Sequence, residues 1–236
     1  MKKFLIFNAD DFGASTGVNR GIIHAHAHGV VTSTSLMVTG HAVQEAVALS
    51  RQHPSLAVGL HWDVWGEDER AFDADDVESV RDELRVQLRR FQDLVGRNPT
   101  HLDSHKHAHR SPNAMPVFCE VGAELGIPVR GNGQVAYLRG FYAQWEWKVT
   151  DLRHVSSDFL QHLVRTEVLA GFSEIGCHPG YVSPDYHAVY LSEREAELET
   201  LTTNAIRATL AEENIELISF ADVLRHDRAA ARGAER

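Results

Sequence analysis

Short apolar runs alternate with helix-like stretches along almost the whole chain. Seven runs have the length and residue types typical of strands, at residues 3–7, 30–38, 56–60, 99–102, 127–130, 172–177 and 215–218. Helical periodicity and capping residues predict helices at 16–28, 41–52, 76–95, 113–125, 156–170 and 192–210, and a short one ending near 225. Strands that alternate with helices in this way form parallel sheets. We therefore expect an α/β fold of about seven parallel strands.

Two architectures fit this pattern: a closed, irregular (β/α) barrel like the TIM barrel, and an open doubly wound sheet. No glycine-rich phosphate loop follows the first strand, which counts against a nucleotide-binding open sheet. The 236 residues suffice for one large domain, and no linker-like stretch divides them. We expect a single barrel domain over residues 1–226, followed by a charged, alanine-rich tail at 227–236 that frays.

Charge and composition exclude several classes of protein. A net charge of −10 argues against nucleic-acid partners, whose phosphates require a basic surface. No apolar stretch reaches the roughly 18 residues of a membrane span. The apolar run at the N-terminus is short and ends at Asp10, so it predicts a buried strand rather than a signal peptide. With only Cys119 and Cys177 there is no disulfide framework, and we expect a cytoplasmic protein.

The segment Asn8-Ala9-Asp10-Asp11-Phe12-Gly13 comes directly after the first apolar run. Adjacent aspartates repel each other, and buried carboxylates are costly unless they are paired or bind a metal. A helix cap or a turn would be the purely structural explanation of such a pair. Because histidines at the ends of other predicted strands offer partners, we interpret Asp10 and Asp11 as part of a cation site.

Three later segments carry histidines where a predicted strand ends. His61 ends the third strand, and His178 follows the sixth. The densest segment, residues 100–109, would place alternate residues on one face if it were extended: His101, Asp103 and His105. The carboxyl ends of parallel barrel strands meet at one rim, where active sites lie. These positions predict a single metal centre built from aspartate and histidine.

Other polar and aromatic residues have more than one interpretation. His178 precedes Pro179, which restricts the residue before it to extended conformations, and a histidine aimed in this way suits a proton donor. A polar loop explains His107 and His109 as well as a metal site does. Aromatic residues in predicted loops could stack on sugar rings or simply close the pocket, namely Trp62, Trp65, Trp145, Trp147 and Tyr181.

Five segments together resemble the YdjC-like family of carbohydrate deacetylases, which includes chitooligosaccharide deacetylases. They are residues 8–13, 31–35, 59–61, 100–107 and 178–180, in the family's order. The resemblance implies a (β/α) barrel related to the polysaccharide deacetylases, with a divalent metal bound by one aspartate and two histidines. In this chain the ligands would be Asp11, His61 and His105. Mg²⁺ or Zn²⁺ is the expected ion, with Mn²⁺ and Co²⁺ as alternatives.

The resemblance also implies catalytic roles. Asp10 would be the general base and His178 the general acid, although the roles of Asp10 and Asp11 could be reversed. Asp103 would orient His178 or one of the ligand histidines. We expect substrate contacts from Trp62, Arg130 and Tyr181.

The expected reaction is removal of an N-acetyl group from an amino sugar or chitobiose-like oligosaccharide, with release of acetate. After His61 the chain continues as Trp62-Asp63-Val64-Trp65, where the family usually has Leu-Thr-Leu-like residues, so substrate choice is expected to differ. Two alternatives stay open: another metal-dependent amidase or phosphoesterase with a non-sugar substrate, and a non-catalytic protein that binds a sugar or a metal. The expected partner is a small N-acetylated sugar, and exposed apolar helix faces leave a homodimer open.

Overall fold

The computed structural model describes residues 2–66 and 72–226, so the predicted tail at 227–236 lies outside the described residues. Within them the chain forms a seven-stranded sheet: β1 (Lys3–Phe12), β2 (Ser33–Leu36), β3 (Ala57–Trp62), β4 (Leu102–Ser104), β5 (Ala136–Leu138), β6 (Gly171–Cys177) and β7 (Ile215–Leu217). The strands pair in the order β4-β3-β2-β1-β6-β5, and β7 pairs with β1. All these pairings are parallel, which confirms the predicted sheet.

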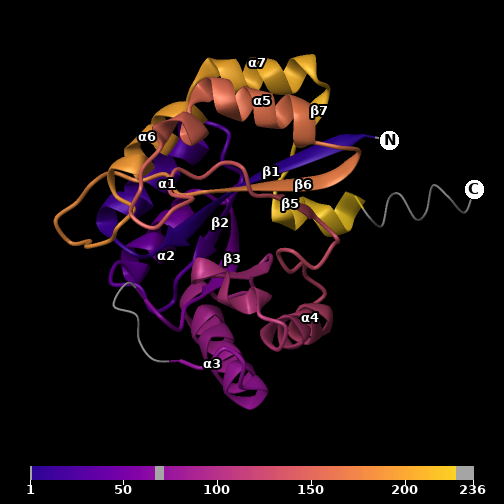
Figure 1. The fold of residues 1–236 in the computed structure, drawn as a ribbon. Coiled ribbons are helices and arrows are strands. Elements are labelled where there is room, and N and C mark those ends of the chain that lie inside the picture. Colours follow the sequence, from indigo (N-terminus) through magenta and orange to yellow (C-terminus); the bar gives the residue numbers. More distant parts are fainter. Residues whose placement is uncertain (1, 67–71, 227–236) are drawn as a thin grey trace, which may run out of the picture.

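Helices surround this sheet, as a (β/α) barrel requires (Figure 1). They are α1 (Thr16–His28), α2 (Val43–Gln52), α3 (Val77–Val95), α4 (Ala114–Leu125), α5 (Ser157–Glu167), α6 (Ser192–Leu201) and α7 (Asn204–Glu212), with the 3₁₀ helices η1 (His105–Arg110) and η2 (Leu152–Val155). Neighbouring helices contact one another around the outside in the sequence α4, α3, α2, α1, α6, α5 and α7. The predicted (β/α) barrel type is therefore confirmed, in the form of a half-barrel: among the described residues the end strands β4 and β5 do not pair with each other.

Strand β1 lies at the centre because both of its edges are occupied. One edge pairs with β6 over Lys3–Ala9. The other edge pairs with β7 over Lys3–Leu5 and with β2 from Asn8 onward. Eight of the ten residues of β1 are buried, which explains why this run is almost continuously apolar until its last residues. Its carboxyl end therefore delivers the Asp10–Asp11 pair to the middle of the barrel rim.

The strongest capping and periodicity patterns in the sequence correspond to helix ends and a buried helix face in the structure. Ser15 caps α1 by accepting a hydrogen bond from the Val18 amide at 3.1 Å. Helix α3 buries Val80, Leu84 and Phe91 on one face. It ends at Gly96, whose φ of 81° suits glycine.

Several predicted elements differ in the structure. The strand expected at 3–7 continues to Phe12, and the strand expected at 99–102 is shifted to Leu102–Ser104. The strand expected at 30–38 is limited to β2, and the helix expected at 192–210 is split into α6 and α7. The split falls at Thr202 and Thr203, whose hydroxyls donate to the carbonyls of Leu198 and Thr200 and so offer the backbone an alternative to a continuous helix. The strand expected at 127–130 is a single bridge between Val129 and Leu102, and the sheet gains β5 instead.

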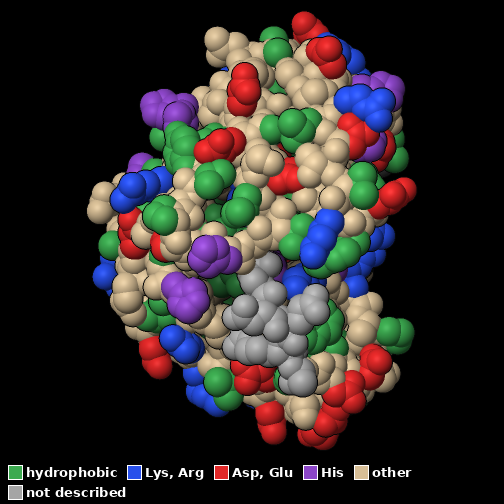
Figure 2. Space-filling view, turned by 60° about the vertical axis from the view of Figure 1, so that its left-hand side comes forward, with side chains coloured by type: hydrophobic (Ala, Val, Ile, Leu, Met, Phe, Trp, Pro, Cys, Tyr) green, Lys and Arg blue, Asp and Glu red, His purple; other side chains and the backbone are tan. Residues whose placement is uncertain are grey.

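Within the described residues, no helix has the combination of length and apolar character needed to cross a membrane. On the face shown in Figure 2, acidic, basic and apolar side chains are interspersed, as is usual for a surface exposed to water.

Candidate metal centre

Five side chains predicted for the site come together at the carboxyl ends of three strands. Asp10 and Asp11 are at the end of β1, His61 is in β3, Asp103 is in β4, and His105 begins η1 directly after β4. All five are almost completely buried. Asp11, His61 and His105 each offer one ligand atom, and these atoms lie within 4.8 Å of one another. The structure thus brings together the residues that the resemblance suggested as ligands.

An unusual backbone allows both aspartates to face the same pocket. Successive residues of a strand point to opposite faces, so a regular strand would separate Asp10 from Asp11. Asp11 instead has a φ of 68°, and the pairing of β1 with β2 changes register between Ala9 and Phe12. A left-handed conformation is uncommon for a residue other than glycine, and such conformations concentrate at functional sites. The local distortion of β1 is what creates the paired-carboxylate site.

The ligand group has the distances and the supporting contact expected of a metal centre. Asp11 Oδ1 lies 3.2 Å from His61 Nε2 and 3.1 Å from His105 Nδ1. The other ring nitrogen of His61, Nδ1, lies 2.7 Å from Asp103 Oδ1. Metal-bound histidines typically donate their second N–H to a carboxylate, which fixes the tautomer. A carboxylate oxygen and two imidazole nitrogens are a donor set that suits divalent ions such as Zn²⁺. Of the two contacts predicted for Asp103, the structure contains the one to a ligand histidine.

Electrostatics keep these groups in defined charge states. Burial disfavours the charged form of Asp11, but Arg194 and the two histidines outweigh it and hold the pKa of Asp11 well below its ordinary value. Burial also disfavours the imidazolium of His61, yet Asp103 and Asp11 raise the pKa of His61 well above its ordinary value. The pocket therefore attracts positive charge, as a cation site must.

Asp10 is held by a buried arginine. Arg130 Nη1 and Nη2 donate to the two oxygens of Asp10, both at 2.7 Å. The same guanidinium donates to Glu174 and lies 3.0 Å from Asp103. Although burial opposes ionisation, Arg130 lowers the pKa of Asp10, so Asp10 is a carboxylate at neutral pH. Arg130 is completely buried, so its position supports contact with Asp10 and not the predicted contact with substrate.

His178 is a second neighbour of Asp10. Its Nε2 is 4.0 Å from Asp10 Oδ2, and its Nδ1 is 3.7 Å from Glu197 Oε1. The backbone N–H of His178 also donates to Glu197, and the rings of Tyr142 and Tyr190 flank the imidazole at 5.6 Å. Burial disfavours the imidazolium, but the Glu197 carboxylate outweighs it and raises the pKa of His178 above its ordinary value.

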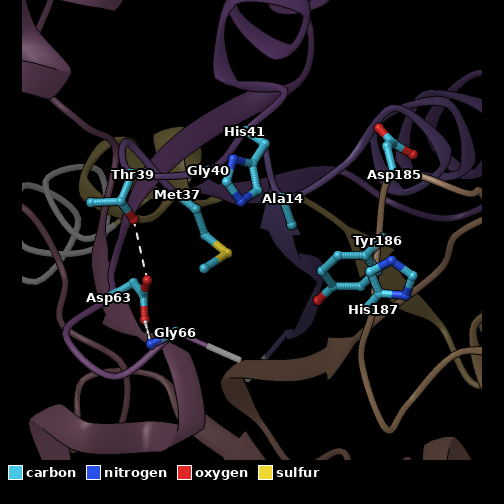
Figure 3. A pocket seen from close by; sticks show the side chains of 10 residues that line it. All are labelled: Ala14, Met37, Thr39, Gly40, His41, Asp63, Gly66, Asp185, Tyr186 and His187. Atoms are coloured by element: carbon cyan, nitrogen blue, oxygen red, sulfur yellow. Dashed lines mark hydrogen bonds between the residues drawn. The ribbon is translucent and has the colours of Figure 1, made fainter. Parts of the chain in front are cut away.

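Two clefts adjoin the centre. One, of about 310 Å³, is shown in Figure 3, with Thr39 and Asp63 on one side and Tyr186 on the other. The second, of about 350 Å³, contains His178 together with aromatic and basic residues, namely Tyr137, Phe141, Tyr142, Trp145, Lys106 and Arg139. Lys106 Nζ donates to the Gly66 carbonyl of the first cleft at 3.0 Å, so the two clefts are neighbours.

The structure does not bring Trp62 and Tyr181, two of the predicted substrate contacts, into either cleft. Trp62 is completely buried, with Phe72 and Phe118 packed edge-on against its ring. Tyr181 hydrogen-bonds to His24 of α1 through its hydroxyl. Its ring is partly exposed and it does not line either cleft. Of the aromatic residues singled out in the sequence, Trp145 is the one that lines the cleft of His178.

Sequence reasoning missed three charged residues at the start of α6. Glu193, Arg194 and Glu197 are buried, and each contacts a different part of the site. Glu193 accepts from Gln144 of the aromatic cleft at 2.6 Å, Arg194 donates to Asp11, and Glu197 accepts from His178. The sequence signal was ambiguous, because acidic residues in the first turn of a helix are explained by the helix dipole alone.

Comparison with known proteins agrees with this geometry. The sequence matches the family model described as YdjC-like protein over residues 4–212. The chitooligosaccharide deacetylase of Serratia marcescens is 34% identical over an alignment of 266 residues, which covers 94% of this chain and all of that protein.

Solved structures share the fold. A proposed cellobiose-phosphate cleavage protein from Enterococcus faecalis has a TM-score of 0.80 and 25% identity, with 94% of this chain and 99% of that chain covered. A family 4 acetyl xylan esterase from Clostridium thermocellum, solved with a cobalt ion, has a TM-score of 0.61 and 14% identity, with 94% and 91% covered. With a family model that matches most of its length and a relative that aligns along almost all of it, this chain belongs to the YdjC-like protein family.

Proposed function

We propose that the protein is a metal-dependent carbohydrate deacetylase, which removes an N-acetyl group from an amino sugar and releases acetate. One observation carries the proposal: Asp10, a buried carboxylate, lies close both to His61 of the Asp11–His61–His105 group and to His178. Hydrolysis of an amide needs an activated water, a proton acceptor and a proton donor, and this arrangement offers a residue for each need. The name of the Serratia marcescens relative supports a sugar substrate.

Asp11, His61 and His105 would hold the ion. A divalent cation bound there would acidify a water molecule and polarise the carbonyl oxygen of the acetamide. The mixed oxygen and nitrogen donors fit Zn²⁺ and also Mg²⁺, Mn²⁺ or Co²⁺. The Clostridium thermocellum esterase, which shares the fold, was solved with a cobalt ion, and this supports the proposal of a divalent metal.

Asp10 would accept the proton of the attacking water. Its low pKa keeps it ionised at neutral pH, and the two hydrogen bonds from Arg130 fix the plane of the carboxylate. Asn8 Nδ2 also donates to Oδ1 at 2.8 Å, so Oδ2, the oxygen 4.0 Å from His178 Nε2, keeps the second lone pair that can accept a proton. Arg130 would thus be a positioning residue for the base.

His178 would donate a proton to the leaving nitrogen. An amine leaves poorly as an anion, so the carbon–nitrogen bond breaks readily only when the nitrogen is protonated. The raised pKa of His178 favours the imidazolium that this step requires. The aromatic cleft that contains His178 would then hold the sugar that carries the departing amine, since aromatic rings stack on sugar faces.

The first experiment measures acetate release from N,N′-diacetylchitobiose. Chelated protein is supplied again with Mg²⁺, Zn²⁺, Mn²⁺ or Co²⁺ in turn, and a generic phosphate ester is tested in parallel. Acetate release that depends on an added ion is the expected result. Hydrolysis of the phosphate ester without acetate release would favour a phosphoesterase, and an unchanged sugar under all conditions would contradict the proposal.

We expect substitution of either ligand histidine to weaken metal binding. His61→Ala and His105→Ala each remove one nitrogen of the ligand group, so the dissociation constant should rise by at least about 100-fold. Calorimetric titration of the chelated proteins measures this directly. His41→Ala is the matched control, because His41 lines the neighbouring cleft and belongs to neither candidate metal group. Wild-type affinity in both ligand variants would disprove the assignment.

We expect Glu197→Gln to shift the pH dependence of turnover. A general acid must be protonated, so turnover should fall as the pH rises through the raised pKa of His178. Removing the Glu197 charge lowers that pKa, and the fall should then occur at lower pH. Glu199→Gln, at an exposed position of the same helix, is the control. An unmoved pH profile of kcat in Glu197→Gln would contradict the role of this contact.

A further inference from the structure

Arg194 of α6 makes a close ion pair with Asp11, one of the candidate ligands. Arg194 Nη2 donates to Asp11 Oδ2 at 2.7 Å. The guanidinium is fixed on other sides by a hydrogen bond from Nε to the Tyr190 carbonyl at 3.0 Å and by the ring of Tyr186, 5.4 Å from Cζ. Only 4% of the Arg194 side chain is exposed. The contact is therefore part of the interior of the site.

This contact divides the two oxygens of Asp11 between different partners. Oδ1 faces the ligand nitrogens of His61 and His105, at 3.2 and 3.1 Å. Oδ2 is occupied by Arg194. A carboxylate can bind a cation through one oxygen or through both, and the positive guanidinium 2.7 Å from Oδ2 repels a cation there, so Arg194 favours binding of Asp11 through Oδ1 alone.

Asp10, the neighbouring aspartate, has a different pattern of contacts. Arg130 donates to both oxygens of Asp10, at 2.7 Å each. Each aspartate of the pair therefore has its own buried arginine, but only Asp11 keeps an oxygen directed at the two histidines. The two arginines distinguish residues that are chemically identical and adjacent in the sequence.

We propose that Arg194 is a positioning residue that restricts Asp11 to one metal-binding oxygen and weakens cation binding through its own positive charge. The inference rests on the metal centre of the proposed function. Weaker binding brings a catalytic advantage, because an ion bound by few protein atoms keeps coordination positions open for water and for the substrate carbonyl. A second oxygen from Asp11 would fill one of those positions.

The test measures metal binding by chelated wild-type protein, Arg194→Gln and Arg194→Lys, using calorimetric titration with Mn²⁺. Removal of a buried positive charge near the cation should make Arg194→Gln bind Mn²⁺ at least about tenfold more tightly. Arg194→Lys keeps the charge and should stay within about threefold of wild type. Unchanged or weaker binding by Arg194→Gln, or equally tight binding by both variants, would overturn the inference. Arg165→Gln, on the surface of α5, controls for the loss of an arginine elsewhere.

A spectroscopic measurement separates the contribution of geometry from that of charge. The visible absorption of bound Co²⁺ loses intensity as its coordination number rises. Release of Asp11 Oδ2 should therefore weaken this absorption in Arg194→Gln relative to wild type, and identical spectra would contradict the restriction to one oxygen. Both measurements are made without substrate. Failure of acetate release would thus count against the deacetylase, whereas failure of the predicted affinity change would count against Arg194 alone.

Discussion

Asp10→Asn should lose most of its turnover while it keeps its metal. The substitution preserves the size of the side chain and removes the charge that lets Asp10 accept a proton. Loss of a general base typically lowers kcat by about 10²- to 10⁴-fold. Metal affinity should change much less, because Asp10 does not belong to the Asp11–His61–His105 group. Acetate release and calorimetric titration, performed on the same preparations, measure the two effects.

The design of this experiment also decides between the two aspartates. Asp10 belongs to a second group of possible ligands, with His61 and Asp103. If Asp10→Asn lost the metal, the roles of Asp10 and Asp11 would be reversed. Asp93→Asn, at an exposed position of α3, is the control for an amide substitution that leaves the site intact. Full turnover by Asp10→Asn would exclude Asp10 as the base.

The barrel could be predicted because hydrophobic periodicity records burial directly. A strand buried on both faces, such as β1, reads as a continuous apolar run. The failure at 127–130 has a physical reason. Pro128 has no N–H to donate, and Gly131, with a φ of 77°, turns the chain away after a single bridge at Val129. Strand β5 has only three residues, too few for an alternating pattern to emerge.

Only those residues of the site that lie at strand ends could be predicted from the sequence. Asp11 and His61 are predicted because each comes at the end of an apolar run, and His105 because alternate residues of an extended segment at 100–109 share one face; the family resemblance suggests their grouping. The arginines could not be assigned in this way: Arg130 is expected only as a substrate contact, and Arg194 is not expected in the site at all. Arg194 is 183 residues from Asp11 in the sequence, and nothing in its own helix indicates which carboxylate it will meet. The tertiary fold alone brings them together.

The buried charges of the centre explain why these distant partners are needed. Asp10, Asp11 and Asp103 are all buried within one pocket, where uncompensated carboxylates would be very unfavourable. Arg130 and Arg194 compensate part of this charge, and His61 shares the rest. A divalent cation at the ligand group would replace the proton on the metal-binding nitrogen of His61 and take over its share of the compensation, so stability and metal binding are expected to be linked.

His178→Ala should reduce amide hydrolysis by about 10²- to 10⁴-fold, an effect as large as loss of the base. The reason is specific to the leaving group, because an amine must be protonated as it departs. His107→Ala is the matched control from the same cleft. Burial and Arg130 lower the pKa of His107 to about 3, so at neutral pH its ring is a neutral imidazole and not the imidazolium that a general acid needs. Its substitution should affect turnover far less than that of His178.

An activated ester separates loss of the proton donor from general damage to the site. The phenolate of p-nitrophenyl acetate departs without protonation, so His178→Ala should retain far more of its activity on this ester than on the N-acetylated sugar. Asp10→Asn should lose activity on both substrates, since each reaction needs an activated water. Equal losses of ester and amide hydrolysis in His178→Ala would show that His178 supports the site as a whole, and would exclude it as the general acid. The ratio of the two activities therefore measures the role of His178 independently of the amount of correctly folded protein.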